Sequence, residues 1–182
     1  MKQRLFVAAG LDDETRAACG RVAEKLRAKG WFARYVPPDN YHLTVAFLGG
    51  VDEQRVDEIV AALREIAPRI PPVDVPLERV GAFPSERRPR VAWIGPNAPL
   101  PAYGTLCGAV RSALTVLGFT FDRNADPHVT LARADATTRG ALPQVTPPPI
   151  DPMRIDALTL YRSFTDRSGA RYEALDRFAL RP

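Results

Sequence analysis

The sequence predicts a single bilobal domain in which helices and strands alternate along the chain. A length of 182 residues suits one domain, and 46% hydrophobic with 25% charged residues is ordinary for a globular protein. The main observation is an internal repeat, because Arg4 and Arg90, and likewise His42 and His128, are 86 positions apart. We interpret residues 4–48 and 90–133 as two copies of one unit, related by pseudo-twofold symmetry within one domain that spans residues 1–182.

In each copy, a strand leads through a helix and a turn to a second strand. Residues 4–11 are apolar and β-rich, which favours a strand, and residues 12–29 have helical spacing and are followed by Gly30. The turn and the second strand follow at 37–40 and 41–48. The second copy repeats this order, with a strand at 90–95, a helix at 101–117 and a strand at 128–132.

The other segments are assigned from the same two periodicities and from turn-forming residues. They are a short strand at 32–36, an amphipathic helix at 52–67, one extended segment at 73–83, a short extended piece at 118–121, a Pro- and Thr-rich loop at 135–149, and a pair of strands at 155–163 and 172–180 around a turn at 166–169.

The composition argues against membrane and secreted classes. No apolar run approaches the ~20 residues of a membrane span. The apolar stretch at residues 5–11 runs directly into three acidic residues, so we expect no signal peptide and a cytoplasmic location. Cys19 and Cys107 lie among apolar neighbours in predicted helices, which indicates buried free thiols. We expect a monomer with no obligate protein partner.

The charge favours an anionic ligand. The formal net charge is +4, and the basic residues are almost all arginine, which either reflects coding bias or suits phosphate through the planar guanidinium fork. Arg87, Arg88 and Arg90 form a basic loop, which is either simply solvated or steers an RNA backbone.

The chain has two histidines, and both stand in the same local pattern. His42 is followed by Thr44 and His128 by Thr130, each pair on a predicted strand. Side chains two positions apart on a strand point to the same face, so each motif presents an imidazole beside a hydroxyl. The pseudo-symmetry then predicts that both motifs line one cleft.

These four side chains suit attack at phosphorus. Hydrolysis of a cyclic phosphodiester needs a base for the attacking water and an acid for the leaving oxygen, and histidine can serve as either near neutral pH. Threonine hydroxyls can donate hydrogen bonds to phosphoryl oxygens, and Arg133, five positions after His128, adds a positive charge. Two histidines without adjacent carboxylates fall short of a metal site, and no phosphate-binding glycine loop is present, so we expect no metal and no cofactor.

The two motifs and their surroundings resemble the 2H phosphoesterase superfamily, and within it the bacterial and archaeal RNA 2′,3′-cyclic phosphodiesterases, also called 2′-5′ RNA ligases. The resemblance extends over nearly the whole chain. The matching segments are residues 4–8 (RLFVA), 40–49 (NYHLTVAFLG), 127–133 (PHVTLAR) and 158–163 (LTLYRS), followed by Tyr172 and Glu173.

This resemblance implies an α+β fold of two lobes, each with an antiparallel sheet flanked by helices, around a central cleft. It also implies opening of RNA or nucleotide 2′,3′-cyclic phosphates to 2′-phosphates, with 2′-5′ ligation as a further activity. In that reaction O3′ leaves, and we expect His42 to be the proton donor and His128 the acceptor, although the symmetry permits the reverse.

By motif position, further side chains are candidates for the same cleft. Thr44, Thr130 and Arg133 would bind the phosphate, and Phe47 either contacts a base or belongs to the core. Tyr161 and Ser163 are candidates for the cleft rim.

Two alternatives stay open at this point. The same site would also suit another cyclic or 2′-5′ linked phosphoester, such as a 2′-5′ oligonucleotide or an ADP-ribose cyclic phosphate. A non-catalytic module that only binds RNA ends is the second alternative, although a pure binder needs no pair of titrating groups.

Overall fold

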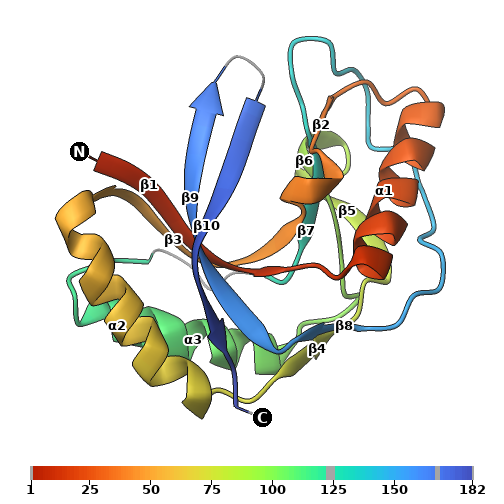
Figure 1. The fold of residues 1–182 in the computed structure, drawn as a ribbon. Helices are drawn as coiled ribbons and strands as arrows, with labels where there is room; N and C mark the ends of the chain where they lie inside the picture. Colours follow the sequence, from red (N-terminus) through yellow and green to blue (C-terminus); the bar gives the residue numbers. More distant parts are fainter. Residues whose placement is uncertain (1, 122–125, 167–168, 182) are drawn as a thin grey trace.

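A computed structural model describes residues 2–121, 126–166 and 169–181 of the chain (Figure 1). None of the described helices is long and apolar enough to cross a membrane. The helices and strands are β1 (Lys2–Gly10), α1 (Asp13–Ala28), β2 (Arg34–Tyr35), β3 (His42–Asp52), α2 (Val56–Ile66), β4 (Val73–Val75), β5 (Arg79–Ser85), β6 (Arg88–Gly95), α3 (Pro101–Thr115), β7 (Val129–Arg133), β8 (Met153–Ile155), β9 (Ala157–Asp166) and β10 (Gly169–Ala179), with short 3-10 turns at Pro38–Asn40, Glu53–Arg55 and Ala67–Arg69.

The strands form one large sheet made of two halves. Its order is β10-β9-β1-β3-β7-β6-β5, with β2 beside β7, and each described pairing is antiparallel. The halves meet at β3 and β7, which pair through Leu43 and Val129. The predicted α+β class is confirmed, and the two expected sheets are joined at this narrow contact. A separate two-stranded sheet consists of β4 and β8.

Each long helix packs against the half of the sheet that did not lead into it. Helix α1 follows β1 but contacts β7, whereas α3 follows β6 but contacts β3. In Figure 1, α1 accordingly lies on the side of β5 to β7, and α2 and α3 lie together beneath β3 and β10. Buried side chains from both helices, among them Leu26 of α1 and Leu106 of α3, therefore belong to one continuous core.

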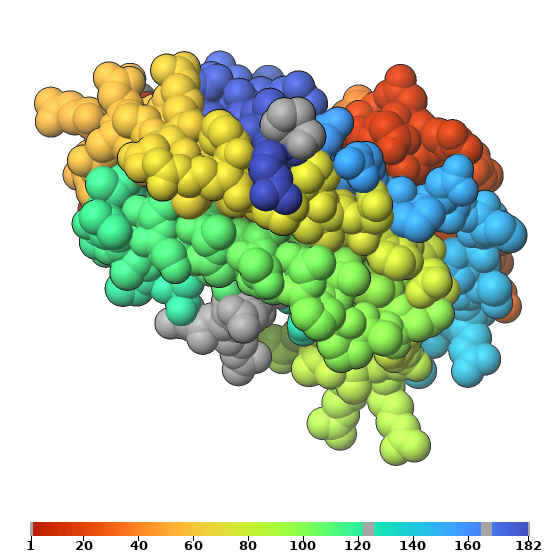
Figure 2. Space-filling model, turned by 90° about the horizontal axis from the view of Figure 1, so that it is seen from below, coloured from red at the N-terminus to blue at the C-terminus, as the bar shows by residue number. Residues whose placement is uncertain are grey.

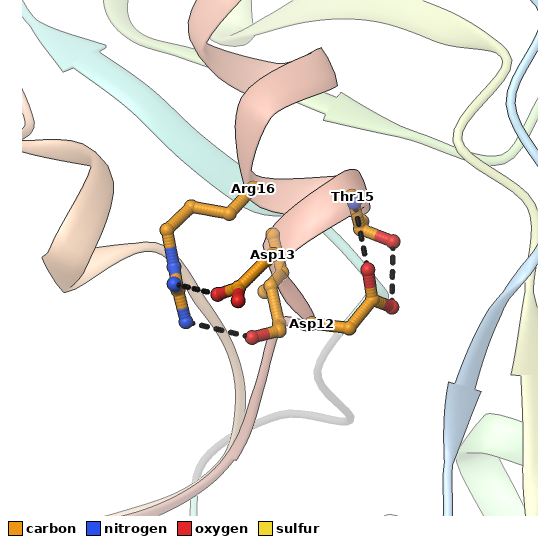
Figure 3. A network of polar contacts seen from close by, with 5 residues as sticks. Asp12, Asp13, Thr15 and Arg16 are labelled. Atoms are coloured by element: carbon orange, nitrogen blue, oxygen red, sulfur yellow. Dashed lines mark hydrogen bonds and ion pairs between the residues drawn. The ribbon is translucent and has the colours of Figure 1, made fainter.

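A local network of polar contacts explains why helix α1 begins at Asp13 (Figure 3). The Asp12 carboxylate accepts hydrogen bonds from the Thr15 backbone amide at 2.7 Å and from the Thr15 hydroxyl at 2.8 Å. These bonds lower the pKa of Asp12, mainly through the amide of Thr15. Arg16 binds Asp13 at 2.6 Å and the carbonyl of Leu11 at 2.9 Å. The cap fixes the turn directly after Gly10, which pairs with His42.

One sequence expectation is wrong in detail. The extended segment expected at 73–83 is divided between β4 and β5, which belong to different sheets, because Pro76 cannot donate a ladder hydrogen bond. The short extended piece expected at 118–121 belongs to none of the described strands. Of the turn expected at 166–169, residues 167 and 168 lie outside the described part of the chain.

The predicted basic loop is the turn of the β5–β6 hairpin. Arg87 and Arg88 are exposed, and this hairpin projects beyond the lower edge of the molecule in Figure 2, where it is yellow-green. Neither arginine lines the cleft described below, which favours the interpretation that they are simply solvated.

Candidate functional site

A cleft of about 600 Å³ lies where the two halves of the sheet meet. It takes its walls from β1, β3, β9 and β10 on one side and from β2 and β7 on the other. Seven of the eight side chains singled out from the sequence line it: His42, Thr44, Phe47, His128, Thr130, Arg133 and Ser163. Tyr161 is not among the lining residues, and its ring instead stacks on Phe6 at 5.3 Å between ring centroids.

In both halves of the sheet, side chains alternate between the cleft and the core at the histidine and the threonine. After the threonine, this alternation is shifted by one residue. Along β3 the burial pattern is half-buried His42 and Thr44, then two buried residues, Val45 and Ala46, then exposed Phe47. A register shift against β1 falls at this point, since Val7 pairs with Ala46 and Ala8 with Thr44. The extra residue in β3 is a β-bulge, and it turns Phe47 towards the cleft.

Strand β7 repeats this irregularity. Thr130 is half-buried, Leu131 and Ala132 are both buried, and Arg133 is exposed. The register shift against β6 lies between Ala132 and Thr130. Strict alternation from Thr130 would point Arg133 into the core, whereas the bulge places it on the cleft side. Phe47 and Arg133 therefore occupy corresponding positions, each five residues after its histidine.

The two imidazoles are held by the same backbone contact. Nδ1 of His42 is 2.8 Å from the carbonyl oxygen of Asn40, and Nδ1 of His128 is 2.7 Å from that of Asp126. A carbonyl only accepts, so each Nδ1 carries the proton and each Nε2 is left for chemistry in the cleft. Nε2 of His42 lies 3.0 Å from the Thr44 hydroxyl, which can donate to it.

Aromatic rings flank each histidine, and sequence reasoning missed them. The His42 ring lies 5.0 Å from Phe6 and 5.3 Å from Tyr172 between ring centroids. The His128 ring lies 5.1 Å from Phe83 and 6.4 Å from Trp93. These rings come from strands remote in sequence, so no local motif predicts them. They restrict the orientation of both imidazoles and exclude water from one side of each.

Glycines make room for the second of these clusters. A Cβ at Gly81 would come within 2.5 Å of the Trp93 ring, and one at Gly95 within 2.5 Å of the Pro127 carbonyl oxygen. The indole and the segment that carries His128 can therefore approach their neighbouring strands only because these positions are glycine.

The cleft is electropositive. The described residues that line it include Arg4, Arg34 and Arg133 and no aspartate or glutamate. Among the described residues, no group of three or more His, Cys, Asp or Glu side chains is arranged to hold a metal ion. The arrangement therefore suits an anion that is bound by arginines and hydroxyls.

Burial lowers the pKa of both histidines below the ordinary value. For His42 the hydrogen bond to Asn40 opposes this shift, while the positive charges of His128 and Arg133 add to it. For His128 the Asp126 carbonyl and carboxylate oppose the shift, and Arg133 again adds to it. The charge of Arg133, which lines the same cleft, thus adds to the lowering of the pKa of both imidazoles.

Helix α3 supports the His42 strand from behind the cleft. Strand β3 pairs with β7 at Leu43 and Val129. The next two carbonyls of β3 accept hydrogen bonds from side chains of α3. The hydroxyl of the fully buried Tyr103 donates to the Thr44 carbonyl at 2.8 Å, and Nε of Arg111 donates to that of Val45 at 3.1 Å.

We expect Tyr103→Phe to lower kcat several-fold with little change in KM. The variant leaves the Thr44 carbonyl without a partner, at a cost of about 1–3 kcal/mol, and frees Thr44 and His42 to shift. Steady-state kinetics and thermal unfolding would measure both effects. Thr105→Val is the matched control on α3, because its hydroxyl is exposed and binds within the helix. An unchanged kcat in a destabilised Tyr103→Phe protein would contradict this positioning role.

Comparison with known proteins shows the family to which this chain belongs. Residues 10–93 match the family model described as LigT like Phosphoesterase. A Thermus thermophilus protein named RNA 2′,3′-cyclic phosphodiesterase is 32% identical over 98% of this chain and 90% of its own length. The chain belongs to the LigT-like phosphoesterases of the 2H superfamily.

The fold of this LigT-like phosphoesterase agrees with that of solved relatives. E. coli LigT in its apo form superposes with a TM-score of 0.80 at 32% identity, covering 100% of this chain and 99% of LigT. A solved protein from Thermus thermophilus gives a TM-score of 0.83 at 30% identity, covering 98% of each chain. E. coli LigT has also been solved with phosphate, at 30% identity, 100% and 99% coverage and a TM-score of 0.77.

Proposed function

We propose that this LigT-like phosphoesterase is a metal-independent cyclic phosphodiesterase that opens RNA 2′,3′-cyclic phosphate ends to 2′-phosphates. The observation that carries the proposal is the pair of imidazoles, each with Nδ1 on the carbonyl two residues before it and Nε2 available in one arginine-lined cleft. Curated relatives from Thermus thermophilus and Thermotoga maritima are named RNA 2′,3′-cyclic phosphodiesterases, which supports this substrate class.

In this reaction, His128 accepts a proton from water as the water oxygen attacks phosphorus. The bond between phosphorus and O3′ breaks, and His42 protonates O3′, so that the product carries a 2′-phosphate and a 3′-hydroxyl. Thr44, Thr130 and Arg133 bind the non-bridging oxygens, where negative charge develops. Phe47 and Ser163 then lie at the cleft wall, where they can contact the nucleoside. Ligation would be the same ring opening with the 5′-hydroxyl of a second RNA in place of water: its oxygen attacks phosphorus, the bond to O3′ breaks, and a 2′-5′ phosphodiester results.

The duplication of residues 4–48 as 90–133 is part of the same proposal. It is supported by the shared contact of both Nδ1 atoms and by the bulge that each strand carries after its threonine. Each copy would contribute half of one active site.

The direct test is to incubate the protein with a 2′,3′-cyclic nucleotide and with RNA that bears a cyclic end, and to locate the phosphate in the product. A 2′-phosphate formed at the same rate with EDTA present is the expected result. Tight binding without product would favour the non-catalytic RNA-end module, and turnover only of 2′-5′ oligonucleotides or ADP-ribose cyclic phosphate would favour the other phosphoester substrates. A cytoplasmic location and a monomeric state stay predictions, which fractionation and gel filtration would check.

The pH dependence of kcat/KM should be bell-shaped with its optimum below about pH 6.5, the ordinary pKa of histidine. One imidazole must be neutral and the other protonated, so the rate falls below the lower pKa and above the higher one. Both pKa values are lowered in the free protein, mainly by burial, and both limbs of the profile therefore move to lower pH. Initial rates at low substrate concentration measure this profile, and an optimum above about pH 7 would contradict it.

A further inference from the structure

The cleft holds more positive charge than one phosphate requires. The proposed function assigns Arg133 to the reacting phosphate, which leaves Arg4 and Arg34, also in the cleft lining, to be explained. The guanidinium of Arg4 lies over the Phe47 ring, 5.2 Å from its centroid. Arg34 stands at the other wall of the cleft and, within the described part of the chain, lies over no aromatic ring.

The register of β2 fixes where Arg34 lies. It is directly opposite Arg133 in the β2–β7 pair, so both side chains leave the sheet on the same side. This pair stands at the end of β7 away from Val129, the residue that joins β7 to β3. Arg34 therefore lies beside Arg133 at that end of β7, and together they widen the positive surface of the cleft at a distance from the junction where His42 begins its strand.

Two like charges in directly opposite positions destabilise a sheet. Within residues 2–121, 126–166 and 169–181, neither Arg34 nor Arg133 has a carboxylate partner, whereas arginines such as Arg64 and Arg162 are paired. Both arginines are exposed to the cleft. An anion beside each guanidinium removes this repulsion.

We propose that Arg34 binds a second phosphate, the one attached to O5′ of the nucleotide that carries the cyclic phosphate. This inference rests on the proposed function. A nucleotide at an RNA 3′ end has only one neighbouring phosphate, and it lies on the 5′ side, so the second anion can come from no other position. Its source is either the phosphodiester of an RNA chain or the 5′-monoester of a free nucleotide. Arg34 thereby favours substrates with two phosphates over nucleoside cyclic phosphates.

The test compares three substrates: adenosine 2′,3′-cyclic phosphate, the same compound with a 5′-phosphate, and the dinucleotide UpA with a 2′,3′-cyclic end. In the natural protein we expect kcat/KM to be about tenfold higher for the two substrates with a second phosphate, mainly through KM. Arg34→Gln should bring the ratio of kcat/KM values close to one. It should also reduce the slope of log kcat/KM against log salt for UpA by about 0.7, the value for one phosphate contact on a single strand.

Arg21→Gln is the matched control, because Arg21 is exposed on α1 and does not line the cleft. It should leave the ratio unchanged. Equal gains for the 5′-phosphate and for UpA would support the subsite and show that either source of phosphate fills it, and a gain for UpA alone would support it for the phosphodiester. A preference for UpA that survives Arg34→Gln, or a natural protein with no preference, would overturn the assignment.

A binding measurement separates this proposal from the proposed function. If none of the three substrates is hydrolysed, the phosphodiesterase proposal fails, but calorimetry with adenosine 2′-phosphate and with UpA bearing a 2′-phosphate still tests Arg34. The subsite is supported if the natural protein has a lower Kd for the dinucleotide than for adenosine 2′-phosphate and if Arg34→Gln removes this difference. Equal Kd values for the two ligands in the natural protein would exclude it.

Discussion

Alanine at His42 or at His128 is expected to lower kcat by about 10²–10⁴-fold, the usual contribution of a general acid or base. Each imidazole is half-buried and bonded to the backbone through Nδ1 alone, so the folded structure should persist. Because the two groups act in one step, the double variant should lose far less than the product of the two single losses. Single-turnover rates and circular dichroism would measure activity and folding, and near-natural rates in either single variant would refute the paired mechanism.

The same two variants decide which histidine is the acid. Loss of the acid removes the requirement for a protonated group, so His42→Ala should lose the fall in rate at high pH. His128→Ala should lose the fall at low pH. The opposite pattern would exchange the two roles, which the symmetric contacts of the imidazoles permit.

Arg133→Gln is expected to lower kcat by about 10²–10³-fold, as removal of one donor to a developing negative charge does in other enzymes. Unlike Arg34→Gln, it should slow the cyclic nucleoside and the cyclic dinucleotide to the same extent. The charge of Arg133 also lowers the pKa of both histidines, so its loss should move the optimum of kcat/KM to higher pH.

Arg133→Lys distinguishes charge from geometry. A lysine keeps the positive charge but not the planar fork, so the pH optimum should stay in place while only part of kcat returns. An Arg133→Gln protein with natural kcat would show that this guanidinium lies outside the reaction.

The part of the site that follows strand alternation could be predicted from the sequence. His42 with Thr44, and His128 with Thr130, occupy alternate positions that need no tertiary information. The place of Arg133 and Phe47 depends on bulges at Val45 and Leu131, where nothing in the local sequence differs from an ordinary apolar strand. Motif position identified these two side chains, and the backbone irregularity explains why they reach the cleft.

Tertiary contacts were beyond the sequence. Phe6 reaches His42 from the neighbouring strand β1, and Phe83 reaches His128 from β5, which β6 separates from β7. The carbonyls of Asn40 and Asp126 are backbone groups that every residue has. The division of 73–83 into two strands was different, because Pro76 is a visible signal that a continuous strand ends there.

The exchange of α1 and α3 between the halves of the sheet has a consequence for how the chain can be divided. Since α1 supports β7 and α3 supports β3, neither half of the sheet has a core of its own. A cut within the β5–β6 turn would leave two fragments, each of which lacks the helix that covers its own histidine strand. Such fragments would be mutually dependent, and only their complementation would restore a folded protein. The two lobes thus describe the shape of the molecule. They are not expected to fold independently, because each depends on a helix from the other part of the chain.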